Sequence, residues 1–197
     1  MSTEKIRVLI VDDHKIVRDG TRAFLEEFNH VEIVGAAANG REAIHFVESY
    51  HPDVVLMDLM MPVMDGIEAT RQITSKDKTV RILIMTSFIA EEMVFSAIEA
   101  GGHSFVMKDT SPEELIEKIE RVHRGEASLE QSIARKMLKS FQACGQGAAL
   151  STFEAEILFR LSEGQALSEI SSQSGISERE LRRKVFQLIQ KFHHLPC

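Results

Sequence analysis

The chain has 197 residues, of which 44% are hydrophobic and 27% are charged, and its formal net charge is −7. This composition is that of an ordinary globular protein and allows one large domain or two small ones. Residues 1–125 hold 14 basic and 22 acidic side chains, so this part is not expected to bind nucleic acid or acidic membranes by itself.

Short apolar runs alternate with amphipathic stretches along residues 1–125. The runs predict strands at 6–11, 31–34, 54–57, 82–85 and 105–107, and the stretches predict helices at 16–28, 42–47, 67–73, 91–100 and 112–124. Continuously apolar strands are covered on both faces, which is typical of a parallel sheet. We therefore predict that residues 1–125 form an α/β domain, a doubly wound, flavodoxin-like five-stranded parallel sheet.

The remaining residues predict helices only. Residues 126–149 are interpreted as a basic helix over 129–142 followed by a flexible linker of small residues. We interpret the basic side chains at 135–139 as a solvated helix face rather than a DNA contact. Residues 150–197 predict a small all-α domain, in which capping boxes begin at Ser151 and Ser177. The letters QSGIS at 173–177 predict the tight turn of a helix-turn-helix.

The cysteine content and the lack of targeting or membrane-spanning segments predict the cellular location. The two cysteines, Cys144 and Cys197, lie far apart and predict neither a disulfide framework nor a metal site. The N-terminal residues do not resemble a secretory signal, and no apolar run approaches the ~20 residues that span a membrane. We expect a cytoplasmic protein in a reducing environment, without a membrane partner.

Polar side chains follow four of the five predicted strands. Asp12 and Asp13 follow the first, Asp58 the third, Thr86 the fourth and Lys108 the fifth. Because the carboxyl ends of parallel strands share one edge of the sheet, these side chains should meet. Crowded carboxylates need a cation, and oxygen ligands favour Mg²⁺. A hydroxyl and an ammonium opposite a carboxylate nucleophile would cradle a phosphoryl group. Each residue alone also fits an ordinary strand end, but the four strand ends together favour the functional interpretation.

Four segments resemble the receiver domain of two-component response regulators. They are VLIVDDH at 8–14, VVLMDLMMPVMDG at 54–66, ILIMTSF at 82–88 and GGHSFVMKD at 101–109. The resemblance implies that Asp58 accepts a phosphoryl group from a sensor histidine kinase and slowly loses it to water, without a separate metabolite substrate. It implies that Mg²⁺ is held by Asp13, Asp58 and the backbone carbonyl of Met60, with Asp12 acting mostly through water.

The same resemblance implies a switch. Lys108 would pair with the phosphoryl oxygens, and Thr86 would move to hydrogen-bond them. Phe105 occupies the switch position, where the family commonly has tyrosine, and a plain core aromatic is the alternative there. Phosphorylation would bias a two-state equilibrium towards a homodimer. Within the family, the receiver is most similar to regulators of the LiaR/VraR kind, which serve cell-envelope stress.

Residues 150–192 resemble the LuxR-type helix-turn-helix of the NarL/FixJ subgroup. The resemblance makes residues 178–192 the recognition helix, and its candidate DNA contacts are Arg179, Arg182, Arg183 and Lys184. Three departures weaken the match. Glu180-Leu181-Arg182 stands where the family has threonine-valine-lysine, Phe153 replaces an arginine, and the family's last helix has no counterpart.

Three functional hypotheses remain open at this point. The first is a response regulator that controls transcription through DNA binding. The second is a phosphorylation-switched interaction or dimerisation module whose divergent C-terminal domain does not bind DNA. The third is a metal-dependent phosphohydrolase of small phosphomonoesters, which the linker, the switch residues and the second domain disfavour.

Overall fold

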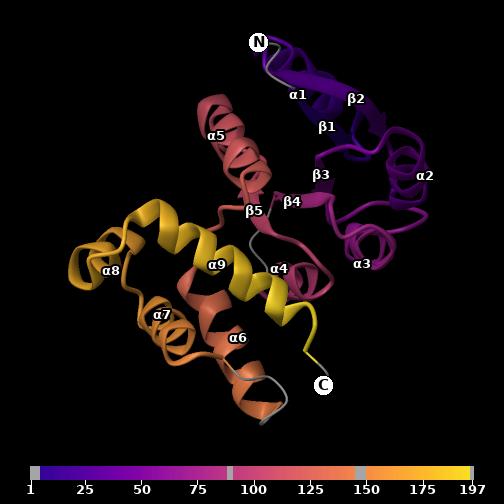
Figure 1. The fold of residues 1–197 in the computed structure, drawn as a ribbon. Coiled ribbons are helices and arrows are strands. Elements are labelled where there is room, and N and C mark those ends of the chain that lie inside the picture. Colours follow the sequence, from indigo (N-terminus) through magenta and orange to yellow (C-terminus); the bar gives the residue numbers. More distant parts are fainter. Residues whose placement is uncertain (1–4, 88–90, 145–149, 196–197) are drawn as a thin grey trace. The chain divides into compact units, whose positions relative to one another are not determined.

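The computed structural model describes residues 5–87, 91–144 and 150–195. The chain divides into two compact units, Met1–Arg124 and Gly125–Cys197. Figure 1 traces the elements from the N-terminus in indigo to the C-terminus in yellow. Phe88, residues 145–149 of the expected linker, and Cys197 lie outside the described residues.

The first unit is a parallel sheet with helices between its strands. The strands are β1 (Ile6–Val11), β2 (Val31–Ala37), β3 (Val54–Asp58), β4 (Arg81–Thr86) and β5 (Ser104–Met107). They lie in the order β2-β1-β3-β4-β5, and every pair is parallel. The helices are α1 (Lys15–Leu25), α2 (Gly40–Tyr50), α3 (Gly66–Lys76), α4 (Glu91–Glu99) and α5 (Pro112–His123). The predicted doubly wound sheet is confirmed.

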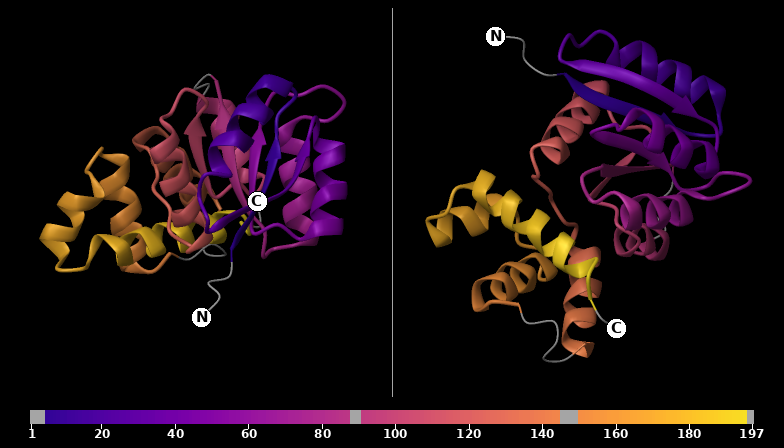
Figure 2. Two further views of the ribbon diagram at one scale, coloured as in Figure 1. Left: turned by 90° about the horizontal axis from the view of Figure 1, so that it is seen from above. Right: turned by 45° about the vertical axis from the view of Figure 1, so that its right-hand side comes forward.

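Both faces of this sheet are covered, which explains the apolar character of its strands. All five residues of β3 are buried. One face packs against α1 and α5 through a core that includes Val8, Leu56 and Ile119. Helices α2, α3 and α4 lie on the other face, as Figure 2 shows. A strand buried on both sides is rigid, so it can hold a polar side chain at its end in a fixed position.

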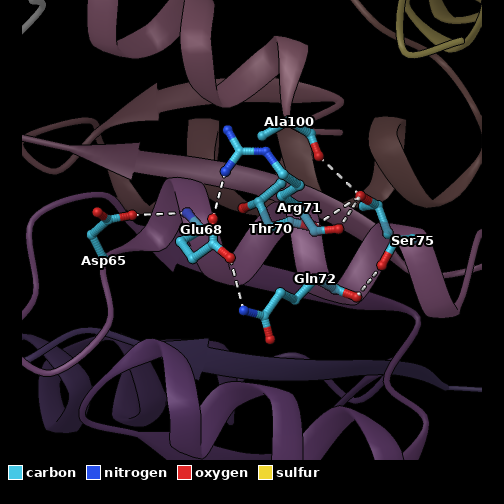
Figure 3. A network of polar contacts seen from close by, with 8 residues as sticks. Asp65, Glu68, Thr70, Arg71, Gln72, Ser75 and Ala100 are labelled. Carbon is cyan, nitrogen blue, oxygen red and sulfur yellow. Dashed lines mark hydrogen bonds and ion pairs between the residues drawn. The ribbon is translucent and has the colours of Figure 1, made fainter.

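The chain between β3 and α3 is held by local polar contacts. The Asp65 carboxylate caps α3 by accepting a hydrogen bond from the Glu68 backbone N–H at 2.8 Å. The Glu68 carboxylate then pairs with Arg71 at 2.5 Å and accepts from the Gln72 amide at 2.8 Å (Figure 3). These contacts fix the start of α3 a few residues after Asp58.

Gly66 packs so closely behind Asp58 that no side chain fits there. A Cβ atom at Gly66 would lie 1.9 Å from the Asp58 carbonyl oxygen. We expect Gly66→Ala to lower the free energy of unfolding by about 3 kcal/mol, because the backbone must move to relieve this overlap. Gly20→Ala on α1 is the matched control, since nothing lies within 4 Å of its Cβ position. In a helix it should stabilise by about 1 kcal/mol. Urea unfolding of both variants measures the two changes, and losses of similar size would contradict this packing.

The described residues of the second unit form a helical bundle. Its helices are α6 (Gln131–Ala143), α7 (Thr152–Ser162), α8 (Leu167–Ser174) and α9 (Glu178–Phe192). At the predicted capping box, the Ser151 hydroxyl accepts from the Glu154 N–H, and the Glu154 carboxylate accepts from the Ser151 N–H. The Ser177 hydroxyl accepts from the Glu180 N–H at 3.2 Å and begins α9. The predicted small all-α domain is confirmed.

Helix α6 belongs to this bundle and is not merely a connection before it. Its buried face includes Ile133, Met137 and Phe141, and it packs against α7. The Phe141 ring lies 6.0 Å from the ring of Phe192 at the end of α9. The Arg135 guanidinium donates to the carbonyl of Ser162 at 2.7 Å. Helix α6 therefore adds a packed helix on the N-terminal side of the helix-turn-helix.

Two sequence expectations concern the cysteines and the membrane. The prediction that the cysteines form no disulfide framework is wrong at Cys144, which is disulfide-bonded. Within the described ranges, no helix is both long and apolar enough to cross a membrane.

Candidate functional site

Strand register brings the candidate side chains to one edge of the sheet. Val11 pairs with Met57, and Asp58 pairs with Met85. Thr86 pairs with Met107, so β4 and β5 end side by side. The side chains that end or follow these strands therefore share the carboxyl edge, where open α/β sheets bind their ligands.

Lys108 bridges two buried carboxylates at this edge. Its Nζ lies 2.5 Å from Asp12 Oδ2 and 2.9 Å from Asp58 Oδ2. Asp12 is 1% exposed and Asp58 is 4% exposed, so water screens neither carboxylate. Asp12 thus makes a direct ion pair, a contact that the sequence did not predict. The Arg18 guanidinium also donates to the backbone carbonyl of Asp12 at 2.5 Å.

Burial and charge oppose each other in this cluster. Burial raises the pKa of Asp58, and the Asp12 charge adds to the rise, although the hydrogen bond and charge of Lys108 work against it. For Lys108, burial lowers the pKa, but the contacts with Asp12 and Asp58 outweigh burial and the pKa is raised. Lys108 is therefore a firmly charged ammonium, and ionised Asp58 is held at a cost in stability.

Replacing Asp58 with asparagine should stabilise the fold at neutral pH. Because the folded-state pKa of Asp58 is raised, stability falls as pH rises from the ordinary carboxyl pKa through the raised value. Asp58→Asn removes this ionisation, so we expect a gain of about 1 kcal/mol at pH 7 that shrinks as the pH is lowered towards the ordinary carboxyl pKa. Urea unfolding across this pH range measures the difference. A variant less stable than the parent at pH 7 would contradict the expectation.

Four residues at the carboxyl edge offer ligand atoms to a metal. One ligand atom from each of Asp12, Asp13, His14 and Asp58 lies within 4.8 Å of the others. The sequence prediction missed His14, although it directly follows the two aspartates. His14 Nδ1 lies 2.7 Å from Asp13 Oδ1, and the His14 backbone N–H donates to Asp12 Oδ1 at 2.8 Å. Three carboxylates at short range are a donor set that fits a hard cation such as Mg²⁺.

The other candidate residues of the first unit lie on or just after strands β3 to β5. Met60 donates its backbone N–H to Asp58 Oδ1 at 3.4 Å. Thr86 is buried, and its backbone carbonyl accepts from the Lys108 N–H at 2.9 Å. Phe105 is 9% exposed. Lys118 on α5 was not predicted; its Nζ donates to the Phe105 carbonyl at 3.1 Å and lies 5.9 Å from the ring centroid.

The four candidate DNA contacts on α9 differ in their surroundings. Arg179 Nε lies 3.0 Å from Glu126 Oε1. Arg182 pairs with Glu178 one turn away and is 17% exposed. Arg183 is exposed and Lys184 is half-buried. Two of the four cations are therefore neutralised within the chain, which the basic run in the sequence did not indicate.

Comparison with known proteins agrees with this architecture. Residues 8–120 match the family model of the response regulator receiver domain. Over 94% of its length the chain is 37% identical to the transcriptional regulatory protein LiaR of Bacillus subtilis, of which it covers 90%. It is 35% identical to the response regulator protein VraR of Staphylococcus aureus, with the same coverage.

Solved structures give the same result. A LuxR-family two-component response regulator from Aurantimonas matches with a TM-score of 0.62 and 38% identity, over 68% of this chain and 98% of that one. The response regulator ChrA of a heme-sensing two-component system matches over 95% of this chain and 90% of that one, with a TM-score of 0.56 and 28% identity.

The chain belongs to the response regulator family of two-component systems. The resemblance inferred from its sequence is thereby confirmed, including the likeness to LiaR and VraR. Its structural neighbours include response regulators of the LuxR and NarL kind. The first unit is hereafter called the receiver unit, and the second the output unit.

Proposed function

We propose that this response regulator accepts a phosphoryl group on Asp58 from a sensor histidine kinase and thereby controls DNA binding by its output unit. One observation carries the proposal. Asp58 is a buried carboxylate at a sheet edge, held 2.9 Å from a lysine and within reach of two further aspartates. A carboxylate kept in this position at a cost in stability has the environment of a reacting group.

The transfer follows from these contacts. An Asp58 oxygen forms the new P–O bond while the P–N bond of the kinase phosphohistidine breaks, and the imidazole keeps the bonding pair and takes a proton. Lys108, which pairs with the Asp58 carboxylate before transfer, moves to the phosphoryl oxygens. Hydrolysis by water later returns the carboxylate, so the protein acts on itself and has no separate metabolite substrate.

Mg²⁺ is the proposed cofactor. The residues that would hold it are Asp13, Asp58 and the backbone carbonyl of Met60, with Asp12 acting through water. When bound, the ion neutralises charge that develops on the phosphoryl oxygens. The carboxylates supply oxygen ligands, and Lys108 is the neighbouring fixed cation, which matches a site built for a polyanionic group.

The added phosphoryl group would set the switch. It brings nearly two negative charges and three acceptor oxygens to the carboxyl edge. Thr86, buried beside Lys108, would turn its hydroxyl to the phosphoryl group. Phe105, whose carbonyl accepts a hydrogen bond from Lys118, would change position with Thr86. This change would alter the surface formed by β5 and α5, and the altered surface would favour a homodimer.

The output unit is proposed to bind DNA through α9. Support comes from the relatives, since LiaR is described as a transcriptional regulatory protein. Arg183 and Lys184 are the α9 candidates outside the ion pairs recorded for the described residues, and Arg183 is exposed. A kinase that uses cellular ATP and a DNA target would both place the protein in the cytoplasm.

A second function is favoured by a specific observation. Arg179 and Arg182 are paired within the chain, and Glu180 is exposed on the first turn of α9. An acidic side chain there repels phosphate, so α9 could instead contact a protein or a second copy of this chain.

Sequence-selective DNA binding separates these two functions. We expect the full chain to enrich a common motif from a random duplex pool, with affinity that falls as salt rises, because lysine and arginine displace counterions. Arg183→Gln should lower the affinity, whereas Gln173→Ala, at an exposed position on α8, is the control. If the pool shows no enrichment at low salt while the phosphorylated chain still dimerises, the output unit is an interaction module.

A further inference from the structure

The start of the output unit lies along α9, on the face that carries Arg179 and Arg182. The cover segment, residues 125–127, directly follows the last turn of the receiver unit in the chain. The backbone N–H of Ala127 donates to the Arg182 carbonyl at 3.1 Å. Glu126 pairs with Arg179 at 3.0 Å, and a Cβ atom at Gly125 would lie 3.8 Å from the Phe186 ring. The contacts all fall within the output unit.

The covered positions form one stripe of the helix. Arg179, Arg182 and Phe186 are spaced by three and four residues, so they share a face of α9. Phe186 is 4% exposed, although it lies among the basic residues of the candidate recognition helix. Arg183 lies outside this stripe and is exposed. The cover segment therefore closes one face of α9 and leaves another open.

Glu126 has the features of a substitute for a DNA phosphate. It is 4% exposed, which is rare for a glutamate unless it is paired. Its partner Arg179 keeps a side-chain exposure of 63%, so the guanidinium is reachable from solvent while its Nε–H is bonded to the carboxylate. A phosphate that approaches Arg179 has to compete with a carboxylate already in place.

We infer that the cover segment is autoinhibitory. The ion pair of Glu126 with Arg179 keeps this arginine from DNA and thereby weakens DNA binding by the face of α9 that includes Arg182. This inference rests on the proposed DNA binding of the output unit. The cover segment is joined to the receiver unit by the chain itself, so a rearrangement there can pull Glu126 away from Arg179. Release frees one cation for a phosphate or a base edge.

The alternative is a purely structural ion pair that only stabilises the start of α9. The two roles predict opposite changes in DNA affinity when Glu126 is replaced. If Glu126 is a mask, its removal strengthens DNA binding. If it is only a support, its removal leaves DNA binding unchanged or weakens it.

The test compares Glu126→Gln with Glu130→Gln in the full chain. Both changes remove one negative charge near the start of the output unit, but Glu130 is exposed and caps α6 without a side-chain hydrogen bond. We expect Glu126→Gln to bind DNA about tenfold more tightly than Glu130→Gln, the scale of one charge-assisted hydrogen bond. Its plot of log affinity against log salt should also be steeper by about one, because one more cation contacts a phosphate.

The outcomes separate the inference from the proposed function. Equal affinities for the two variants, with the parent still binding DNA, would overturn the mask and leave the function standing. Binding by Glu126→Gln but not by the parent would support the mask. If no variant binds DNA at low salt, both the function and the mask are overturned. Thermal unfolding shows whether each variant is folded.

A second measurement needs no variant of Glu126. In the parent chain, the Arg179 Nε–H should exchange slowly with water, since it is bonded to a buried carboxylate, whereas the Arg183 Nε–H should exchange fast. On addition of the selected duplex, the Arg179 Nε–H resonance should shift as the arginine leaves Glu126. A resonance that does not move while DNA binds would overturn the inference even if Glu126→Gln does not fold.

Discussion

The Asp58→Asn protein is expected to take up no phosphate, either from a phosphorylated histidine kinase or from acetyl phosphate. The amide keeps the shape of the side chain but has no charged oxygen to form the P–O bond. The Asp58 carboxylate also pairs with Lys108 at 2.9 Å. The substitution therefore removes the charged oxygen that, in the parent chain, would carry the phosphoryl group beside Lys108. Intact-mass measurement after phosphorylation records the added phosphoryl group directly.

The matched control for this loss is Asp109→Asn. Asp109 directly follows Lys108 in the chain but is exposed. We expect this variant to be labelled like the parent chain. If Asp58→Asn is still labelled stoichiometrically in the presence of Mg²⁺, another residue accepts the phosphoryl group and the assignment of Asp58 as the acceptor is wrong.

Lys108→Ala is expected to permit phosphorylation of Asp58 but to prevent the dimerisation that phosphorylation causes in the parent chain. The variant should still be labelled at a reduced rate, because Asp58 and the metal ligands remain. It should not dimerise in response, since no ammonium remains at the end of β5 to follow the phosphoryl oxygens. It also leaves Asp12 and Asp58 buried without their shared cation, so we expect a loss of about 3 to 5 kcal/mol in stability at neutral pH.

Light scattering on the phosphorylated Lys108→Ala protein measures its dimerisation, and urea unfolding measures its loss of stability. Lys15→Ala is the control, because this lysine at the start of α1 is 78% exposed and pairs only with Asp19 among the described residues. It should dimerise like the parent chain. A Lys108→Ala protein that dimerises normally when phosphorylated would refute the role given to this lysine.

The sheet and its carboxyl edge could be predicted because their signals are local. Each strand is a continuous apolar run, and the parallel arrangement follows from burial on both faces. Once the strands are placed, topology alone brings Asp12, Asp58 and Lys108 together. The ion pair between Asp12 and Lys108 was not predicted, since the order of charges within a cluster depends on side-chain positions that the sequence pattern does not specify.

The output unit was harder to predict for the same physical reason. The bounds of α9 follow from the Ser177 cap and the spacing of its apolar residues. By contrast, the pairing of Glu126 with Arg179 joins residues 53 positions apart. The packing of Phe141 on Phe192 likewise depends on how the bundle folds back. A signal did exist for α6, since Ile133, Met137 and Phe141 recur every four residues, which is typical of a helix that packs against a core.

The central claim is that one phosphoryl group on Asp58 controls DNA binding by the output unit. The most direct measurement is the affinity of the full chain for its selected duplex before and after beryllofluoride and Mg²⁺ are added, beside Asp58→Asn under the same conditions. We expect the affinity of the parent chain to rise about tenfold or more, a coupling of ordinary allosteric size, and the variant not to respond. Equal affinity of the parent chain in both states, with the mimic shown to be bound, would contradict the account.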